Sequence, residues 1–231
     1  MRIVVIGDTH GHQTWKRILN DEEYDKAIML GDYVDSFTLQ PRDIADNLLD
    51  IIKHKERMGD KLILLYGNHD HSYYHGERCS GWNRVGHWLY GSLLEDMFKE
   101  KMFELIHIDG DIIYSHAGVS DYWMREVAGF DKVEDITFEN ILSTNAGLDL
   151  LDWNMIKGYD GYGDTISQSP IWIRPHSLLK CKVDGYRQVV GHTHLRTPVE
   201  QDGIWFNDQM PDYYIVVDDG SIEFKESNLM F

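Results

Sequence analysis

Residues 3–11 read IVVIGDTHG, an apolar run that gives way to a glycine and a cluster of polar residues. A short apolar run bounded by glycine is typical of a strand that is buried on both faces. The same pattern recurs in IMLGDYVD at residues 28–35 and in LLYGNHD at residues 64–70. Between the second and third runs, residues 42–57 carry apolar positions on one side, and a helix is predicted there. Strand–helix units in succession favour an α/β (α+β) domain with a parallel component.

The rest of the chain predicts a less regular mixture of helices and strands. Asp109 and Gly110 form a turn signal, so residues 103–107 and 111–115 are expected to pair as a hairpin. Further helices are expected over residues 15–19, 89–100, 120–127 and 133–142, and further strands over residues 188–190, 204–206, 213–217 and 222–224. We therefore expect a single domain over residues 1–231, with cap insertions near 71–100 and 120–180.

The charge of the chain argues against general nucleic-acid binding. The chain has 231 residues, and 22 Lys plus Arg against 39 Asp plus Glu give a net charge of −17. A field of that sign repels polyanions, so general nucleic-acid binding is not expected. A small phosphorylated substrate remains compatible, because a bound cation can reverse the local potential.

The expected environment of the chain is the cytoplasm. Cys79 and Cys181 are its two cysteines, too few for a disulfide framework. The first residues turn polar at Asp8, so no signal peptide is predicted. Apolar runs are far shorter than the roughly 20 residues of a membrane-spanning helix, and no membrane partner is expected. The oligomeric state is left open by the sequence.

Polar clusters follow the ends of five predicted strands. They are GDTHG at 7–11, GDYVD at 31–35, GNHD at 67–70, SHAG at 115–118 and GHTH at 191–194. Each cluster alone could be a turn or a solvated pair of residues. Because the carboxyl ends of strands in α/β sheets border one crevice, the five together predict a shared site. Oxygen and imidazole ligands without thiolate suit Mn, Fe, Zn or Ni rather than a structural cysteine-type zinc site.

These motifs, in this order and over residues 7–194, resemble those of the calcineurin-like metallophosphoesterases. The bacterial and phage phosphoprotein-phosphatase-like branch is the most similar. The resemblance implies a two-layer β-sandwich core flanked by helices, in a four-layer arrangement. It also implies two metal ions at the strand ends, with Mn first and Fe, Zn or Ni as alternatives.

The resemblance further assigns roles to individual residues. One metal ion would be bound by Asp8, His10, Asp32 and His194, and the other by Asp32, Asn68, His116 and His192, with the Asp32 carboxylate bridging. A hydroxide between the two cations would attack phosphorus in line. His69 would protonate the leaving oxygen as general acid, and Asp35 would hold its imidazole in the protonated form. A loop histidine and a turn-capping aspartate are the alternatives for these two residues.

One departure from the family pattern concerns phosphate binding. Where the phosphoprotein-phosphatase branch has Arg-Gly after the second Asp of GDxVD, this chain has Ser36 and Phe37. Arg174, in a Trp-containing segment, is a candidate replacement that could form a fork on phosphate, although it could equally be a surface arginine. Arg78 and Arg84, in the insertion after GNHD, are further candidates. The aromatic residues of that insertion fit either core packing or a wall for base stacking.

We therefore predict a metal-dependent phosphoester hydrolase acting on phosphomonoesters, with phosphoserine or phosphothreonine as one substrate class. A phosphodiesterase or dinucleoside-polyphosphate hydrolase with the same metals is the alternative. The expected partners are thus a phosphorylated small molecule, a nucleotide or a phosphoprotein. A different class also stays open, an inactive scaffold of this fold that serves as a binding module.

Overall fold

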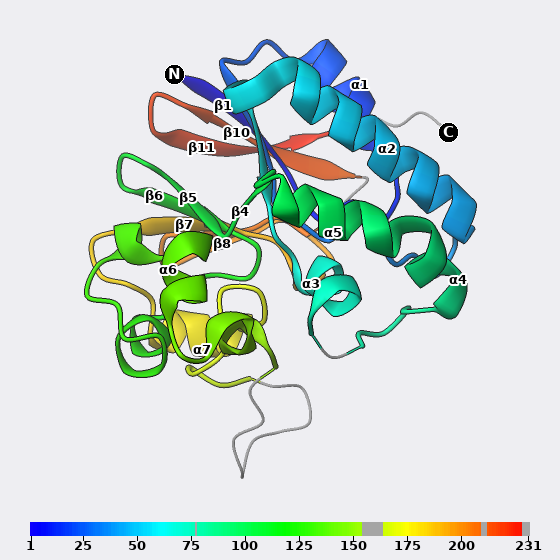
Figure 1. Ribbon diagram of the computed structural model, residues 1–231. Helices are drawn as coiled ribbons and strands as arrows, with labels where there is room; N and C mark the ends of the chain where they lie inside the picture. Colours follow the sequence, from blue (N-terminus) through cyan, green and yellow to red (C-terminus); the bar gives the residue numbers. More distant parts are fainter. Residues whose placement is uncertain (77, 154–163, 209–211, 228–231) are drawn as a thin grey trace.

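Two β-sheets pack face to face, and helices cover the outer side of each sheet in the computed structural model (Figure 1). The structure describes residues 1–76, 78–153, 164–208 and 212–227. A buried apolar cluster fills the space between the sheets, with Ile3 and Val5 of the first sheet packed against Tyr114 and Val189 of the second. The predicted two-layer core flanked by helices is therefore confirmed.

The first sheet contains the strands expected from the start of the chain. Its order is β11 (Ser221–Glu226), β10 (Tyr213–Asp218), β1 (Arg2–Ile6), β2 (Lys26–Met29), β3 (Leu62–Leu65), β4 (Phe103–Glu104). Strands β1 to β4 run parallel, and β10 is antiparallel to β1. Alternate residues of β1 point to opposite faces, so that Val4 and Ile6 pack under helices while Ile3 and Val5 face the second sheet.

The second sheet contains the two strands that precede the polar clusters SHAG and GHTH. Its order is β5 (Ile106–Asp109), β6 (Ile112–Ser115), β7 (Arg187–Val190), β9 (Ile204–Phe206), β8 (Val199–Gln201). Strands β6, β7 and β9 are parallel. The carboxyl ends of β6 and β7 therefore lie at one edge of this sheet.

Helices complete the outer layers. The α-helices are α1 (Thr14–Asp21), α2 (Pro41–Met58), α3 (Asn68–Tyr74), α4 (Arg84–Gly86), α5 (Ser92–Lys99), α6 (Phe138–Ser143) and α7 (Pro175–Lys180). Short 3-10 or π turns occupy Gly59–Lys61, His87–Gly91, Trp123–Val127, Val133–Asp135 and Gly147–Leu151. Figure 1 shows α1 and α2 on the outer side of the first sheet and α6 and α7 on the opposite side of the molecule. No helix in the described part of the chain is long and apolar enough to span a membrane.

The predicted hairpin of residues 103–107 with 111–115 forms, but its first strand begins at Ile106, so that the prediction is wrong for residues 103–105. The chain leaves one sheet and enters the other at Leu105, so that Phe103 pairs with Leu64 of β3, whereas Ile106 pairs with Ser115 of β6. Both short stretches are apolar, and their sequence carries no signal for the sheet that each joins. The turn at Asp109 and Gly110 is where it was expected.

The helix predicted over residues 133–142 is also divided. A 3-10 turn ends at Asp135, and α6 begins after Thr137, whose Oγ1 accepts a hydrogen bond from the Asn140 N–H at 3.2 Å. This side chain caps a new helix start. The proposed insertion at 71–100 contains α4 and α5, and part of the insertion at 120–180, residues 154–163, lies outside the described residues. Their role as caps stays a prediction.

Candidate active site

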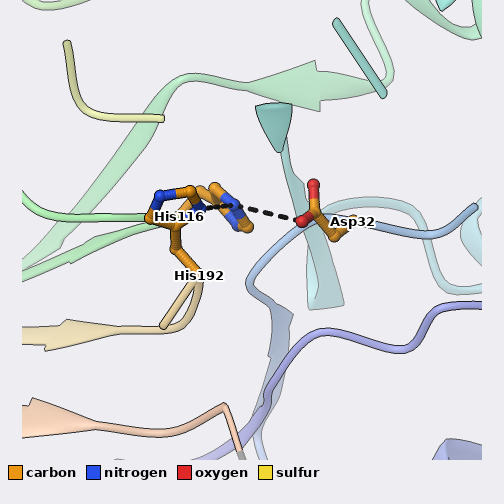
Figure 2. Close-up of side chains that lie close together, drawn as sticks. All are labelled: Asp32, His116 and His192. Carbon is orange, nitrogen blue, oxygen red and sulfur yellow. Dashed lines mark hydrogen bonds and ion pairs between the residues drawn. The ribbon is translucent and has the colours of Figure 1, made fainter. Parts of the chain in front are cut away.

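Loops at the carboxyl ends of five strands meet between the two sheets. Strand β2 leads into Asp32, β6 into His116 and β7 into His192. Figure 2 shows the imidazoles of His116 and His192 facing the carboxylate of Asp32, although the three residues come from different strands and both sheets. The polar clusters that the sequence placed at strand ends are therefore brought together.

The backbone of these loops is bent in a way that most residues avoid. His10, Asp32, Asp35 and His192 have φ angles of 44°, 52°, 62° and 65°, in the left-handed region. Residues other than glycine rarely adopt this region, because it costs free energy. They are found mainly at functional sites, where the surrounding structure holds the backbone in this conformation. A Cβ at Gly67 would overlap the Asp32 carboxylate, so only glycine lets the two loops approach this closely.

One group of donor atoms surrounds Asn68, the first residue of α3. Its Oδ1 lies 2.8 Å from His116 Nε2 and 2.9 Å from His192 Nδ1. His116 Nε2 also lies 3.4 Å from Asp32 Oδ2. The His116 Nδ1–H donates to the Leu30 carbonyl at 2.9 Å, which leaves the lone pair on Nε2, inside the group. A histidine fixed in this tautomer by a backbone carbonyl is ready to bind a metal ion.

A second group of donor atoms consists of Asp8, His10 and Asp32, with ligand atoms within 4.8 Å of one another. His10 Nδ1 donates to the Val34 carbonyl at 2.9 Å, so Nε2 again carries the lone pair, 4.0 Å from Asp32 Oδ2. Asp32 belongs to both groups, as a bridging ligand would. His194 is exposed and is not part of either group, so its assignment as a ligand stays a prediction.

The electrostatics of the site favour the entry of cations. Burial and the charges of Asp208 and Asp32 raise the pKa of Asp8 well above its ordinary value. Burial and the charge of Asp32 likewise raise the pKa of Asp70. Burial opposes ionisation of Asp32 too, but the electrostatic influence of the neighbouring His116, His69 and His10 lowers its pKa. Buried carboxylates this close repel one another, and bound cations would relieve that repulsion. The donor set thus fits two metal ions in both geometry and charge.

His69 and Asp35 lie beside the donor groups as a hydrogen-bonded pair. The His69 Nδ1–H donates to Asp35 Oδ2 at 2.9 Å, while Nε2 lies 3.9 Å from Asp32 Oδ2. Burial lowers the pKa of His69, but the charges of Asp32 and Asp35 outweigh burial and raise it to about 9. The imidazole is therefore protonated at neutral pH in the protein alone. Its backbone N–H donates to Asp32 Oδ1 at 2.9 Å, which ties it to the donor groups.

The three candidate arginines lie in different surroundings. Arg174 donates from Nη1 to Thr193 Oγ1 at 3.2 Å, within the loop that carries His192. Burial lowers the pKa of Arg174, and the charge of Asp32 opposes that shift, so the guanidinium lies within the field of the site. Arg78 lies with its guanidinium 3.9 Å from the ring centre of Trp82, a cation–π contact on an exposed part of the insertion. Arg84 is exposed at the start of α4.

Sequence reasoning missed two acidic residues of this region. Asp70 accepts hydrogen bonds from the N–H groups of Asp32, Tyr33 and Gly67 at 2.9, 3.0 and 3.0 Å, and so ties two site loops together. An acidic residue three positions after the N-cap, here Gly67, is a capping signal that could have identified it. Asp208 follows β9 just as the predicted ligands follow their strands, so the same strand-end pattern could have indicated it.

Comparisons with known proteins identify the family of this chain. The family model of the calcineurin-like phosphoesterases (Metallophos) matches residues 1–196. A curated relative, the symmetrical bis(5'-nucleosyl)-tetraphosphatase of Nitrosospira multiformis, is 25% identical over 140 residues, which are 55% of this chain and 47% of the relative. The chain thus matches less than half the length of that relative.

Solved structures with the same fold include two phosphatases. The cold-active protein-tyrosine phosphatase of a psychrophilic Shewanella species is 14% identical with a TM-score of 0.59, over 98% of this chain and 78% of that chain. A protein serine/threonine phosphatase from Saccharomyces cerevisiae is 15% identical with a TM-score of 0.61, over 97% of this chain and 79% of that chain. At such identities the likeness shows the fold alone. Since the family model covers most of the chain, this protein belongs to the calcineurin-like phosphoesterase family.

Proposed function

We propose that this protein hydrolyses phosphoesters at a site that holds two divalent metal ions. The observation that carries this proposal is the pair of donor groups that share Asp32, with His69 hydrogen-bonded to Asp35 beside them. When bound, two such cations stabilise charge on a phosphoryl group and make a water molecule a better nucleophile. The donors are oxygen and imidazole nitrogen, which suit Mn first, and Fe, Zn or Ni as well.

The ligands divide into two sets around the shared carboxylate. Asp32, Asn68, His116 and His192 would hold one ion, and Asp8, His10 and Asp32 the other. His194 would join the second set after a rotation of its exposed side chain. Asp8 is further fixed by the His192 backbone N–H, which donates to both carboxylate oxygens at 3.1 and 3.0 Å. The His192 backbone thus holds the Asp8 carboxylate in place.

His69 would supply the proton that the leaving oxygen needs. Its Nδ1–H is committed to Asp35, so the proton available for transfer is the one on Nε2, on the side of the donor groups. The proton passes from Nε2 to the leaving alkoxide, which departs as an alcohol and leaves a neutral imidazole. General acid catalysis of this kind contributes about 10²–10⁴-fold to a rate.

Phosphomonoesters are the proposed substrates, with phosphorylated side chains of proteins as one class. Support comes from Arg174, whose guanidinium lies in the field of the site and beside the His192 loop, where it could bind the non-bridging oxygens of a monoester. A guanidinium binds such oxygens in pairs, and a monoester offers more of them than a diester. The cytoplasm is the proposed location of this activity.

A dinucleoside-polyphosphate hydrolase is the second candidate. The observation that favours it is the match to a symmetrical bis(5'-nucleosyl)-tetraphosphatase over 55% of this chain. The same metal ligands and the same general acid would serve that reaction, because it too is an attack of water on phosphorus. The scaffold alternative has less support, since seven of the eight ligand positions, counting Asp32 twice, converge in the described residues.

Hydrolysis of p-nitrophenyl phosphate and of bis-p-nitrophenyl phosphate in the presence of Mn²⁺ tests this proposal. We expect faster hydrolysis of the monoester, and a loss of activity in His69→Ala. Preference for the diester would favour the second candidate and justify trials with dinucleoside polyphosphates. If neither compound is hydrolysed by protein that has bound its metal ions, the hydrolase proposal is wrong and the scaffold alternative replaces it.

A further inference from the structure

Asp35 is a buried carboxylate with both of its oxygens engaged. Oδ2 accepts the His69 Nδ1–H at 2.9 Å, and Oδ1 accepts a hydrogen bond from the Tyr73 hydroxyl. The residue is 2% exposed and has a left-handed backbone with a φ of 62°. Its Cβ lies 3.3 Å from the position that a Cβ on Gly81 would take, so the neighbouring loop leaves little room for movement. The pairing with His69 was expected from the sequence, whereas the contact with Tyr73 was not.

His69 and Tyr73 approach Asp35 from the same helix. They are four residues apart in α3, so their side chains lie on one face of the helix, one turn apart. Asp35 lies in the loop after β2 and receives one hydrogen bond from each of them. The helix therefore sets the distance between the two donors, and the carboxylate is held between them.

Residues of the 71–100 insertion fix the phenol in turn. The Tyr73 oxygen accepts from the Asn83 N–H at 3.3 Å and lies 3.3 Å from the Tyr90 oxygen. Its ring stacks on Trp82 with centroids 5.8 Å apart and an interplanar angle of 22°. A hydroxyl has a single proton, and that proton is used on Asp35, so its oxygen is free to accept from Asn83 and Tyr90. Burial raises the pKa of Tyr73, and its bond to Asp35 adds to that shift, so the phenol keeps its proton.

We infer that Tyr73 is a positioning residue for the general acid: it holds the Asp35 carboxylate so that His69 presents Nε2–H to the leaving oxygen. This inference rests on the proposed function and adds a route by which the 71–100 insertion acts on catalysis. Tyr73 keeps its own proton throughout, and the transferred proton comes from His69 alone. Removing the hydroxyl takes one hydrogen bond from the buried Asp35 carboxylate and loosens its hold on His69.

The dependence of the rate on the leaving group distinguishes positioning of an acid from a general structural role. Phenyl phosphate has a poorer leaving group than p-nitrophenyl phosphate and needs protonation more. In Tyr73→Phe we expect kcat for phenyl phosphate to fall about tenfold, while kcat for p-nitrophenyl phosphate and both KM values change little. Asp35→Asn should produce a larger effect of the same kind, because it removes the carboxylate itself.

A matched control is Tyr114→Phe. Tyr114 is buried on β6, and its hydroxyl has no hydrogen-bond partner among the described residues, so this variant removes a buried phenol oxygen outside the Asp35 network. We expect it to leave the ratio of the two rates as in the wild type. An equal fall in both rates in Tyr73→Phe, a rise in KM alone, or no change would overturn the inference.

A measurement without substrate separates this inference from the proposed function. In protein with ¹⁵N-labelled histidine, the His69 Nδ1–H signal is identified by its loss in His69→Gln. We expect this proton to exchange slowly with water in the wild type and in Tyr114→Phe, and rapidly in Tyr73→Phe. If the wild type hydrolyses neither compound, the proposed function is wrong, and the exchange result alone then decides whether Tyr73 holds the pair. Equal exchange in the wild type and Tyr73→Phe would contradict that.

Discussion

Glu22 and Asp8 are carboxylates in two regions of the molecule whose pKa values move in opposite directions. Glu22, at the end of α1, accepts hydrogen bonds from Arg2 at 2.9 Å, Tyr214 at 2.7 Å and Lys225 at 2.8 Å. Burial opposes its ionisation, but these partners lower its pKa to about 2. The chain supplies the positive charge that this carboxylate needs.

Asp8 follows β1, the strand that carries Arg2, but it lies among other carboxylates. Burial and the charges of Asp208 and Asp32 raise its pKa. Its hydrogen bonds come from the neutral backbone N–H of His192. In the Glu22 region, positive side chains of the folded chain balance the negative charge. In the Asp8 region, the charge of the carboxylates is balanced, and the region thus completed, only when cations enter from solution. This difference is the physical basis for assigning metal ions to the second region.

The largest expected effect follows from removing the shared carboxylate. Asp32→Asn keeps the size of the side chain but removes the charge that both donor groups share. Metal ions contribute several kcal/mol of transition-state stabilisation, so we expect the rate of p-nitrophenyl phosphate hydrolysis to fall by about 10³-fold or more. Asp96→Asn, the same change at an exposed position of α5, is the control and should be close to wild type. Activity within tenfold of wild type in Asp32→Asn would contradict a bridging role.

Removing the metal ions should lower the Tm of the protein, and substitution of Glu22 should not change that response. An ion present at 100 times its dissociation constant stabilises the folded state by about 2.7 kcal/mol. For a chain of this size, we expect a chelator to lower Tm by about 5–10 °C, and Mn²⁺ to restore it. Thermal unfolding measures this shift, and Glu22→Gln should show the same dependence on metal as the wild type. A Tm that does not respond to the chelator in either protein would mean that no cation completes the Asp8 region.

Substituting Glu22 should affect stability alone. Because its folded pKa lies below the ordinary 4.5, Glu22 stabilises the fold above that pH, and this stabilisation is lost as pH falls toward about 2. We expect Glu22→Gln to lower the free energy of unfolding at pH 7 by about 1–3 kcal/mol, with no change in metal content or activity. Urea unfolding of both proteins at pH 7 and pH 3 measures this, and the difference between them should shrink at pH 3. A difference that is the same at both pH values would show that charge is not the cause.

The smallest effect is expected from substituting Arg174, which carries a positive charge beside the site. If Arg174 binds substrate rather than compensating the carboxylates, Arg174→Ala should raise KM for a phosphomonoester about tenfold, as loss of a charged hydrogen bond does. Metal content and the response of Tm to chelator should not change. Arg78→Ala, which removes a guanidinium stacked on Trp82, is the comparison and should alter KM less. Tighter binding of metal ions in Arg174→Ala, with KM unchanged, would instead show that Arg174 compensates the charge of the carboxylates.

The strand-end motifs predicted much of the fold and of the site, because a polar cluster after a buried strand has a fixed place at the edge of a sheet. The path of the chain at Leu105 could not be predicted, since both flanking stretches are apolar and either sheet would bury them. Tyr73 was seen only as one aromatic residue of an insertion. Its contact with Asp35 joins residues 38 positions apart, and only the folded chain brings them together.

The central claim is that the Asp8 region is completed by two metal ions, and the metal content per chain tests it most directly. Protein loaded with Mn²⁺ and freed of excess would be measured by elemental analysis beside Asp32→Asn and Glu22→Gln. We expect about two ions per chain in the wild type and in Glu22→Gln, and less than one in Asp32→Asn, because one carboxylate serves both groups. No bound metal in the wild type, or the same content in Asp32→Asn, would contradict the claim.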